Sequence, residues 1–128
     1  MKLYIDDIRK APDESWHIAR TVGEAVNAIY MFGEKLTHIS LDHDISYQLE
    51  LNNVSRPYPS PETFKTVAIY MGEYYKSHNT PDGAYPHVTI HSSNPVGAVE
   101  IEEILHQAGF SQIDVVPAHA ANRLEMEV

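Results

Sequence analysis

Short apolar segments rich in β-branched residues alternate with longer amphipathic segments along most of the chain. The short segments have the composition of buried strands, and the longer ones repeat their apolar residues at helical spacing. The expected strands are 2–6 (KLYID), 16–20 (WHIAR), 37–42 (THISLD), 86–91 (PHVTIH) and 112–117 (QIDVVP). Strands that alternate with helices are typical of a parallel sheet covered on both faces. We therefore expect one doubly wound α/β domain over 1–128, in strand order 2-1-3-4-5, because crossover connections are right-handed.

Three helices are expected between these strands. A capping box at 21–24 opens the first, because a Thr hydroxyl and a Glu three residues later each satisfy an otherwise unpaired N–H group. Ser60-Pro61 opens the second and Asn94-Pro95 the third, since proline suits the first helical position, where no N–H is needed.

Two connections do not fit a minimal version of this plan. The segment 8–15 is too short and too broken by proline for a full helix, so the first helix of such a fold is short or absent. The segment 43–60 is a long connection, and such loops are usually functional or mobile. We expect it to form a lid with Tyr47, Asn52, Asn53 and Arg56.

The composition limits the classes of partner. The net charge is −9, from 9 basic and 18 acidic residues, so the chain has no surface-wide grip on duplex nucleic acid. There is no cysteine, which excludes disulfides and zinc–thiolate sites. No apolar stretch approaches the roughly 18 residues of a membrane span, and the N-terminus does not have the pattern of a signal peptide. A cytoplasmic protein without a membrane partner is expected.

Polar residues follow three of the expected strands at their carboxyl ends. They are Asp6 and Asp7, then Asp42, His43 and Asp44, then His91, Ser92 and Ser93. In an open parallel sheet the carboxyl ends of the strands share one edge, and ligands bind beyond it. The three clusters therefore predict one site.

The residue types in these clusters indicate phosphate chemistry. Carboxylates that lie close together need a proton or a cation between them, and their hard oxygens suit Mg²⁺ or Mn²⁺. A histidine ligand would favour a more azaphilic metal. Imidazoles can move protons near neutral pH, and serine hydroxyls can donate to phosphate oxygens. Structural interpretations also remain open: Asp6-Asp7 as a turn, His91 as a strand-end histidine and Asn94 as a helix cap.

An acidic pair after the first strand, an Asp after the third and a Ser after the fourth resemble a two-component receiver domain, which has a flavodoxin-like fold. That resemblance implies that the acidic pair and Asp42 bind Mg²⁺, and that Asp42 accepts a phosphoryl group. The receiver lysine is replaced by Val116 before Pro117, and His43 and Asp44 have no receiver counterpart. These departures disfavour phosphorelay reception.

Three motifs resemble a narrower group, the cyclic-phosphate-processing receiver-like domains. They are DD-x-R-x-x-P at 6–12, LDHD at 41–44 and HS-x-NP-x-G at 91–97, in that order. The resemblance implies a role in handling cyclic phosphates of nucleotides or RNA ends.

We therefore expect a metal-assisted phosphoesterase on a degenerate receiver fold, whose ligand is a phosphorylated small molecule or an RNA end. The expected roles are metal binding by Asp6, Asp7 and Asp42, acid–base catalysis by His43 and His91, and phosphate binding by Arg9, Ser92 and Asn94. Asp44 is expected either to bind the Mg²⁺ or Mn²⁺ ion or to orient His43.

Two alternatives remain. One is a non-catalytic pseudo-receiver that senses a cyclic nucleotide or binds a partner protein. The other is a metal-free phosphoesterase with two histidines, because HISL at 38–41 and HVTI at 87–90 both fit H-x-S/T followed by an apolar residue. We expect those residues in mid-strand beneath helices, away from the predicted site.

Overall fold

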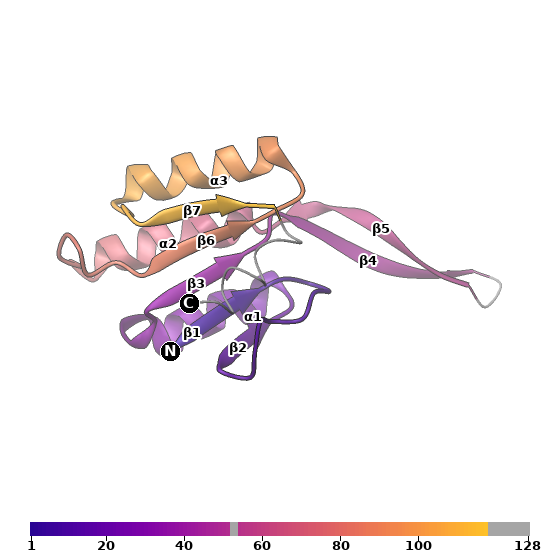
Figure 1. Ribbon diagram of the computed structural model, residues 1–128, viewed down its shortest axis with the longest axis horizontal. Helices are drawn as coiled ribbons and strands as arrows, with labels where there is room; N and C mark the ends of the chain where they lie inside the picture. The colour runs from indigo at the N-terminus through magenta and orange to yellow at the C-terminus, as the bar shows by residue number, and fades with distance from the viewer. Residues whose placement is uncertain (52–53, 118–128) are drawn as a thin grey trace.

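The computed structural model describes residues 1–51 and 54–117, with side chains described in these ranges outside 46–61. A five-stranded parallel sheet forms the body of the molecule, and a two-stranded antiparallel hairpin extends from it (Figure 1). The sheet strands are β1 Lys2–Ile5, β2 Trp16–Ala19, β3 His38–Leu41, β6 His87–His91 and β7 Ile113–Val116. Their spatial order, β2-β1-β3-β6-β7, confirms the predicted order 2-1-3-4-5 and the receiver-like fold.

Two of the three helices begin where the sequence predicts. Helix α1 (Val22–Phe32) follows Thr21, whose side chain accepts the N–H of Glu24, and it leads into the short 3-10 helix η1 (Gly33–Lys35). Helix α3 (Pro95–Ala108) is capped by Asn94. No helix in the described ranges is both long and apolar enough to cross a bilayer.

The second helix begins later than predicted. Helix α2 spans Lys65–Ser77, and Ser60-Pro61 do not open it. The reason is that Val54–Thr63 forms strand β5, which pairs in antiparallel register with β4 (Asp44–Leu51). The predicted loop at 43–60 is therefore mostly a β-hairpin, which projects from the sheet in Figure 1. The side chains of the four expected lid residues lie outside the described residues.

The base of the hairpin is closed. Asp44 pairs with Thr63, and the carbonyl oxygen of His43 accepts the N–H of Phe64 at 2.9 Å. The chain thus leaves the sheet after β3 and returns to the same point before α2. His43 is fixed at this junction.

The three helices form a single layer, because α1 contacts α2 and α2 contacts α3. Alternate strand residues such as Leu3, Ile5, Val88 and Ile90 point into this layer and join one apolar core. The connection between β1 and β2 contains no helix, which confirms the expectation that the first helix of this fold is short or absent.

The register brings the predicted clusters together. Ile5 pairs with Leu41, and Leu41 with Ile90, so the residues that follow these three lie at one level of the sheet. The N–H of Asp42 also donates to the carbonyl oxygen of Ile5 at 3.0 Å, which extends the ladder by one residue. The carboxyl edge therefore carries the three clusters side by side.

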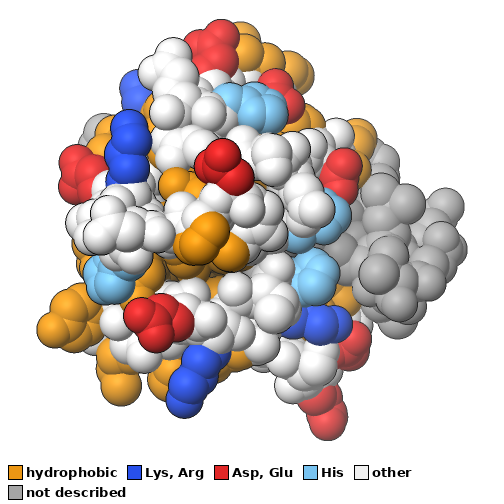
Figure 2. Space-filling model, turned by 90° about the vertical axis from the view of Figure 1, so that its left-hand side faces the viewer, with side chains coloured by type: hydrophobic (Ala, Val, Ile, Leu, Met, Phe, Trp, Pro, Cys, Tyr) orange, Lys and Arg blue, Asp and Glu red, His pale blue; other side chains and the backbone are white. Residues whose placement is uncertain are grey.

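The opposite, amino edge carries His38 and His87, which begin β3 and β6 and are partners in register. Figure 2 shows this end of the molecule, where acidic, basic and histidine side chains are interspersed. The expectation that the two H-x-S/T segments lie beneath helices is wrong, because Ile39 and Val88, not the histidines, face the helix layer. The hydroxyl of Ser40, one member of the first segment, is buried against His91.

Candidate active site

Asp6 is completely buried, and both of its carboxylate oxygens are fully engaged. Oδ1 accepts the backbone N–H groups of Ile8 and Arg9, each at 2.9 Å. Oδ2 accepts from the guanidinium of Arg9 at 3.2 Å and from Nε2 of His91 at 2.9 Å. Burial alone would raise the pKa of Asp6, but the hydrogen bonds from His91 and from the two backbone groups hold that pKa well below its usual range. Asp6 is therefore an ionised carboxylate whose roughly four acceptor positions are filled.

Arg9 links the first two clusters. Its side chain is 32% exposed, and Nη1 donates to Oδ2 of Asp42 at 2.9 Å as well as to Asp6. Arg20, which was not expected in the site, fixes the backbone between Asp6 and Arg9. Its guanidinium donates to the carbonyl oxygens of Asp6 (3.0 Å) and Arg9. Arg9 thus places a positive charge between the carboxylates of Asp6 and Asp42.

Asp42 lies at the tip of β3 with the opposite electrostatic character. Burial and the nearby charge of Asp6 raise its pKa, although the N–H of His43 and the charge of Arg9 act against this. Oδ1 accepts the N–H of His43 at 2.7 Å, and Oδ2 accepts from Arg9. Acceptor positions remain on both oxygens.

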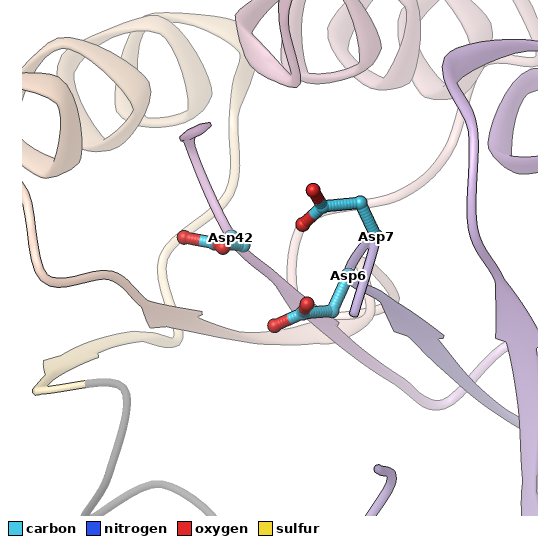
Figure 3. Close-up of side chains that lie close together, drawn as sticks. All are labelled: Asp6, Asp7 and Asp42. Carbon is cyan, nitrogen blue, oxygen red and sulfur yellow. The ribbon is translucent and has the colours of Figure 1, made fainter. Parts of the chain in front are cut away.

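Three carboxylates converge at this edge. Oxygen atoms of Asp6, Asp7 and Asp42 lie within 4.8 Å of one another. Figure 3 shows Asp6 and Asp7 at consecutive positions after β1, with their side chains extending toward Asp42 at the end of β3. The donor set consists of hard oxygens and fits Mg²⁺ or Mn²⁺. Each of the three offers one oxygen to such an ion, but Asp6 already accepts four hydrogen bonds, whereas Asp42 accepts two.

His91 is completely buried behind the carboxylates. Its ring stacks on Tyr4, with centroids 4.7 Å apart and planes 6° apart. Nδ1 bonds to Oγ of Ser40 at 2.7 Å, and Nε2 bonds to Asp6, so both nitrogens are occupied. Since a carboxylate only accepts, Nε2 carries a hydrogen. In this position His91 orients Asp6 and does not face a ligand in solvent.

His43 is held differently. Its Nδ1 lies 2.7 Å from Oδ1 of Asp44, whose side chain is 57% exposed. Partial burial acts to raise the pKa of Asp44, but the hydrogen bonds from His43 and Asn94 outweigh it. The pKa is therefore below its ordinary value, and the carboxylate is ionised. Because that oxygen accepts, Nδ1 carries the hydrogen, and Nε2 is the nitrogen that can take a proton.

Ser92 and Asn94 shape the turn between β6 and α3. Oγ of Ser92 accepts the N–H of Asn94 at 3.0 Å, and Oδ1 of Asn94 accepts the N–H of Gly97 at 3.0 Å. A cavity of about 480 Å³ opens beside this turn, lined by Ser92, Ser93, the first turns of α3 and the end of β7. Phosphate binding by Ser92 and Asn94 stays a prediction.

Residues 1–107 match the family described as "Cyclic-phosphate processing Receiver domain". This chain belongs to that family. No curated protein and no solved structure matches the chain.

In this cyclic-phosphate processing receiver domain, the structure brings all three motifs to one edge of the sheet. The first motif supplies the carboxylates and Arg9, the second supplies Asp42, His43 and Asp44, and the third supplies His91 and the cap of α3. Sequence reasoning missed that Tyr4 and Ser40 hold His91. Their spacing offered one signal: both sit two positions before a site aspartate, on the same face of their strands.

Proposed function

We propose that this chain is a phosphoesterase that acts on cyclic phosphates of nucleotides or RNA ends with the help of a divalent ion. The observation that supports it best is the pairing of His43 with Asp44 directly beside the carboxylate cluster and Arg9. A carboxylate that orients an imidazole next to a phosphate-binding guanidinium is an arrangement suited to phosphoester hydrolysis.

The chain's own residues have separable roles in this proposal. In ring opening, a water oxygen forms a bond to phosphorus, one ring P–O bond breaks, and the released sugar oxygen takes up a proton. Nε2 of His43 accepts the proton of the attacking water and returns a proton to the leaving oxygen. Arg9, with one-third of its side chain exposed, binds the phosphate oxygens.

Asp7 and Asp42 would hold Mg²⁺ or Mn²⁺, and Asp6 would fix the turn and Arg9 around them. When bound, the ion would neutralise phosphate charge and lower the pKa of water. We assign His91 to the support of Asp6 instead of the acid–base role expected from the sequence, because both of its ring nitrogens are bonded, one to Ser40 and one to Asp6.

A second candidate is a non-catalytic sensor of a cyclic nucleotide. One observation favours it: Arg9 already bridges Asp6 and Asp42, so these carboxylates have a cation between them without a metal ion. A sensor would bind 2′,3′-cyclic nucleotides without turning them over.

A turnover assay distinguishes the phosphoesterase from the sensor, and chelation in the same assay tests the role of the ion. Turnover of 2′,3′-cyclic AMP in Mg²⁺ or Mn²⁺ is expected to fall to background in excess EDTA and to return when the ion is restored. Product release followed by chromatography measures this. Turnover that persists in EDTA would contradict the ion's role, and binding without turnover between about pH 5 and pH 9 would establish the sensor.

Asp42→Asn tests the ion site itself. The substitution keeps the shape and removes one negative charge, so Mn²⁺ affinity measured by calorimetry is expected to weaken at least about tenfold. The thermal unfolding of the variant should resemble that of the wild type. Unchanged Mn²⁺ affinity would remove Asp42 from the site.

A further inference from the structure

We propose that the first turn of helix α3 positions His43 for proton transfer, with Gly97 and Asn94 as the positioning residues. This inference rests on the proposed function, in which His43 moves the proton. Neither residue has to touch the substrate for this role. The segment N-P-x-G at 94–97 would then hold the imidazole of His43, which belongs to a different segment of the chain.

Gly97 provides the space that the imidazole occupies. A Cβ atom at this position would come within 2.6 Å of Cγ, Nδ1 and Cδ2 of His43. Such a separation does not occur between non-bonded atoms, and both groups have little freedom to move. Gly97 is buried in a helix, and His43 is only 7% exposed and starts the closed base of the hairpin. Any side chain larger than hydrogen would therefore displace the ring.

Asn94 joins the helix cap to the histidine. Its Oδ1 accepts the N–H of Gly97, which is an ordinary N-cap bond. Its Nδ2 donates at 3.2 Å to Oδ1 of Asp44, the oxygen that also binds Nδ1 of His43. One amide thus caps α3 with its oxygen and holds the orienting carboxylate with its nitrogen.

Together these contacts fix both the place and the tautomer of the ring. Gly97 defines the surface against which the ring lies, and the Asn94–Asp44 pair keeps the hydrogen on Nδ1. Pro95 lies between them at the first helical position, where its missing N–H is not needed. A loss of either contact is expected to leave the fold but misplace Nε2.

Asn94→Asp is the sharpest test, because Asp caps helices about as well as Asn. The cap bond survives, but the new carboxylate cannot donate to Asp44 and repels it. We expect turnover of 2′,3′-cyclic AMP to fall about 10- to 100-fold with little change in KM. Long-range ¹H–¹⁵N spectra of the imidazoles should show that His43 loses its fixed Nδ1–H tautomer. The thermal unfolding midpoint should stay close to that of the wild type.

Gly97→Ala has a matched control in Gly23→Ala. Both glycines lie in the first turn of a helix, but the nearest atom to a Cβ at Gly23 is 3.9 Å away, in the side chain of Thr21. Gly97→Ala is expected to lower turnover about 100-fold and to shift the His43 ring resonances, whereas Gly23→Ala changes neither.

Unmoved His43 resonances in both Asn94→Asp and Gly97→Ala would overturn the positioning role, whatever the activity. Because the spectra need no turnover, shifted resonances in a protein that hydrolyses nothing would support the positioning and refute the phosphoesterase. If Gly97→Ala fails to fold, Asn94→Asp alone decides.

Discussion

Asp6→Asn is expected to lower the free energy of unfolding by about 3–5 kcal/mol near neutral pH, the usual loss when one partner of a buried ion pair is removed. Asp6 is fully buried and accepts four hydrogen bonds, two from Ile8 and Arg9 backbone groups and two from charged or polar side chains. An amide in its place offers one oxygen, and its NH₂ group would face the donors of Arg9 and His91. Urea unfolding followed by circular dichroism measures the loss.

The same substitution at Asp42 is the matched control. The pKa of Asp42 is raised by burial and by Asp6, so its charge opposes folding near neutral pH. Asp42→Asn should change the free energy of unfolding by less than about 1 kcal/mol. Equal losses at the two positions would contradict the different electrostatic roles assigned to them.

The loss at Asp6 should also depend on pH in a defined direction. The folded pKa is depressed relative to the ordinary value of 3.8, so ionised Asp6 stabilises the fold above that value. As the pH falls below about 4, the unfolded carboxyl takes up a proton first, and the advantage of the wild type over Asp6→Asn shrinks. A difference that grows on acidification would refute this interpretation.

His43→Ala is expected to reduce turnover of 2′,3′-cyclic AMP by about 10²–10⁴, the usual contribution of general acid–base catalysis, while the protein stays folded. Nε2 of His43 is the nitrogen that no described side chain occupies, and its ring is oriented by Asp44. Initial rates measured together with nucleotide affinity separate loss of chemistry from loss of binding. Affinity should change far less than turnover.

His91→Ala gives the contrasting result. It removes the stack on Tyr4, the hydrogen-bond partner of the buried Ser40 hydroxyl and one of the four donors to Asp6, so stability should fall before any specific kinetic effect is visible. A fully stable His91→Ala protein with turnover reduced as in His43→Ala would restore the acid–base role to His91.

The sheet and the edge that carries the site could be predicted because both follow from local patterns. Buried strands and capped helices are visible in residue spacing, and the handedness of the crossovers then fixes the strand order. Once the strand order is known, the polar residues that follow the strands are expected to lie together at one edge.

The hairpin and the roles of the two histidines could not be predicted in this way. Proline at positions 57, 59 and 61 is typical of a loop, and only pairing with β4 makes the segment a strand. The expected strand bounds already place His91 at the end of its strand and His43 beyond its own. They do not show that the ring of His91 is buried against Tyr4 with both nitrogens hydrogen-bonded. Those contacts run across strands, and spacing along one strand does not reveal them.

The closed base of the hairpin makes the length of the hairpin independent of the geometry at the edge of the sheet. Because the two ends of the hairpin pair at Asp44 and Thr63, between β3 and α2, residues can be added to or removed from its far end without changing the register of β3 or the start of α2. Among the described elements, the two hairpin strands make their extensive contacts only with each other. Relatives with hairpins of different length are therefore expected to keep His43 and the carboxylate cluster in the same arrangement at the base of the hairpin.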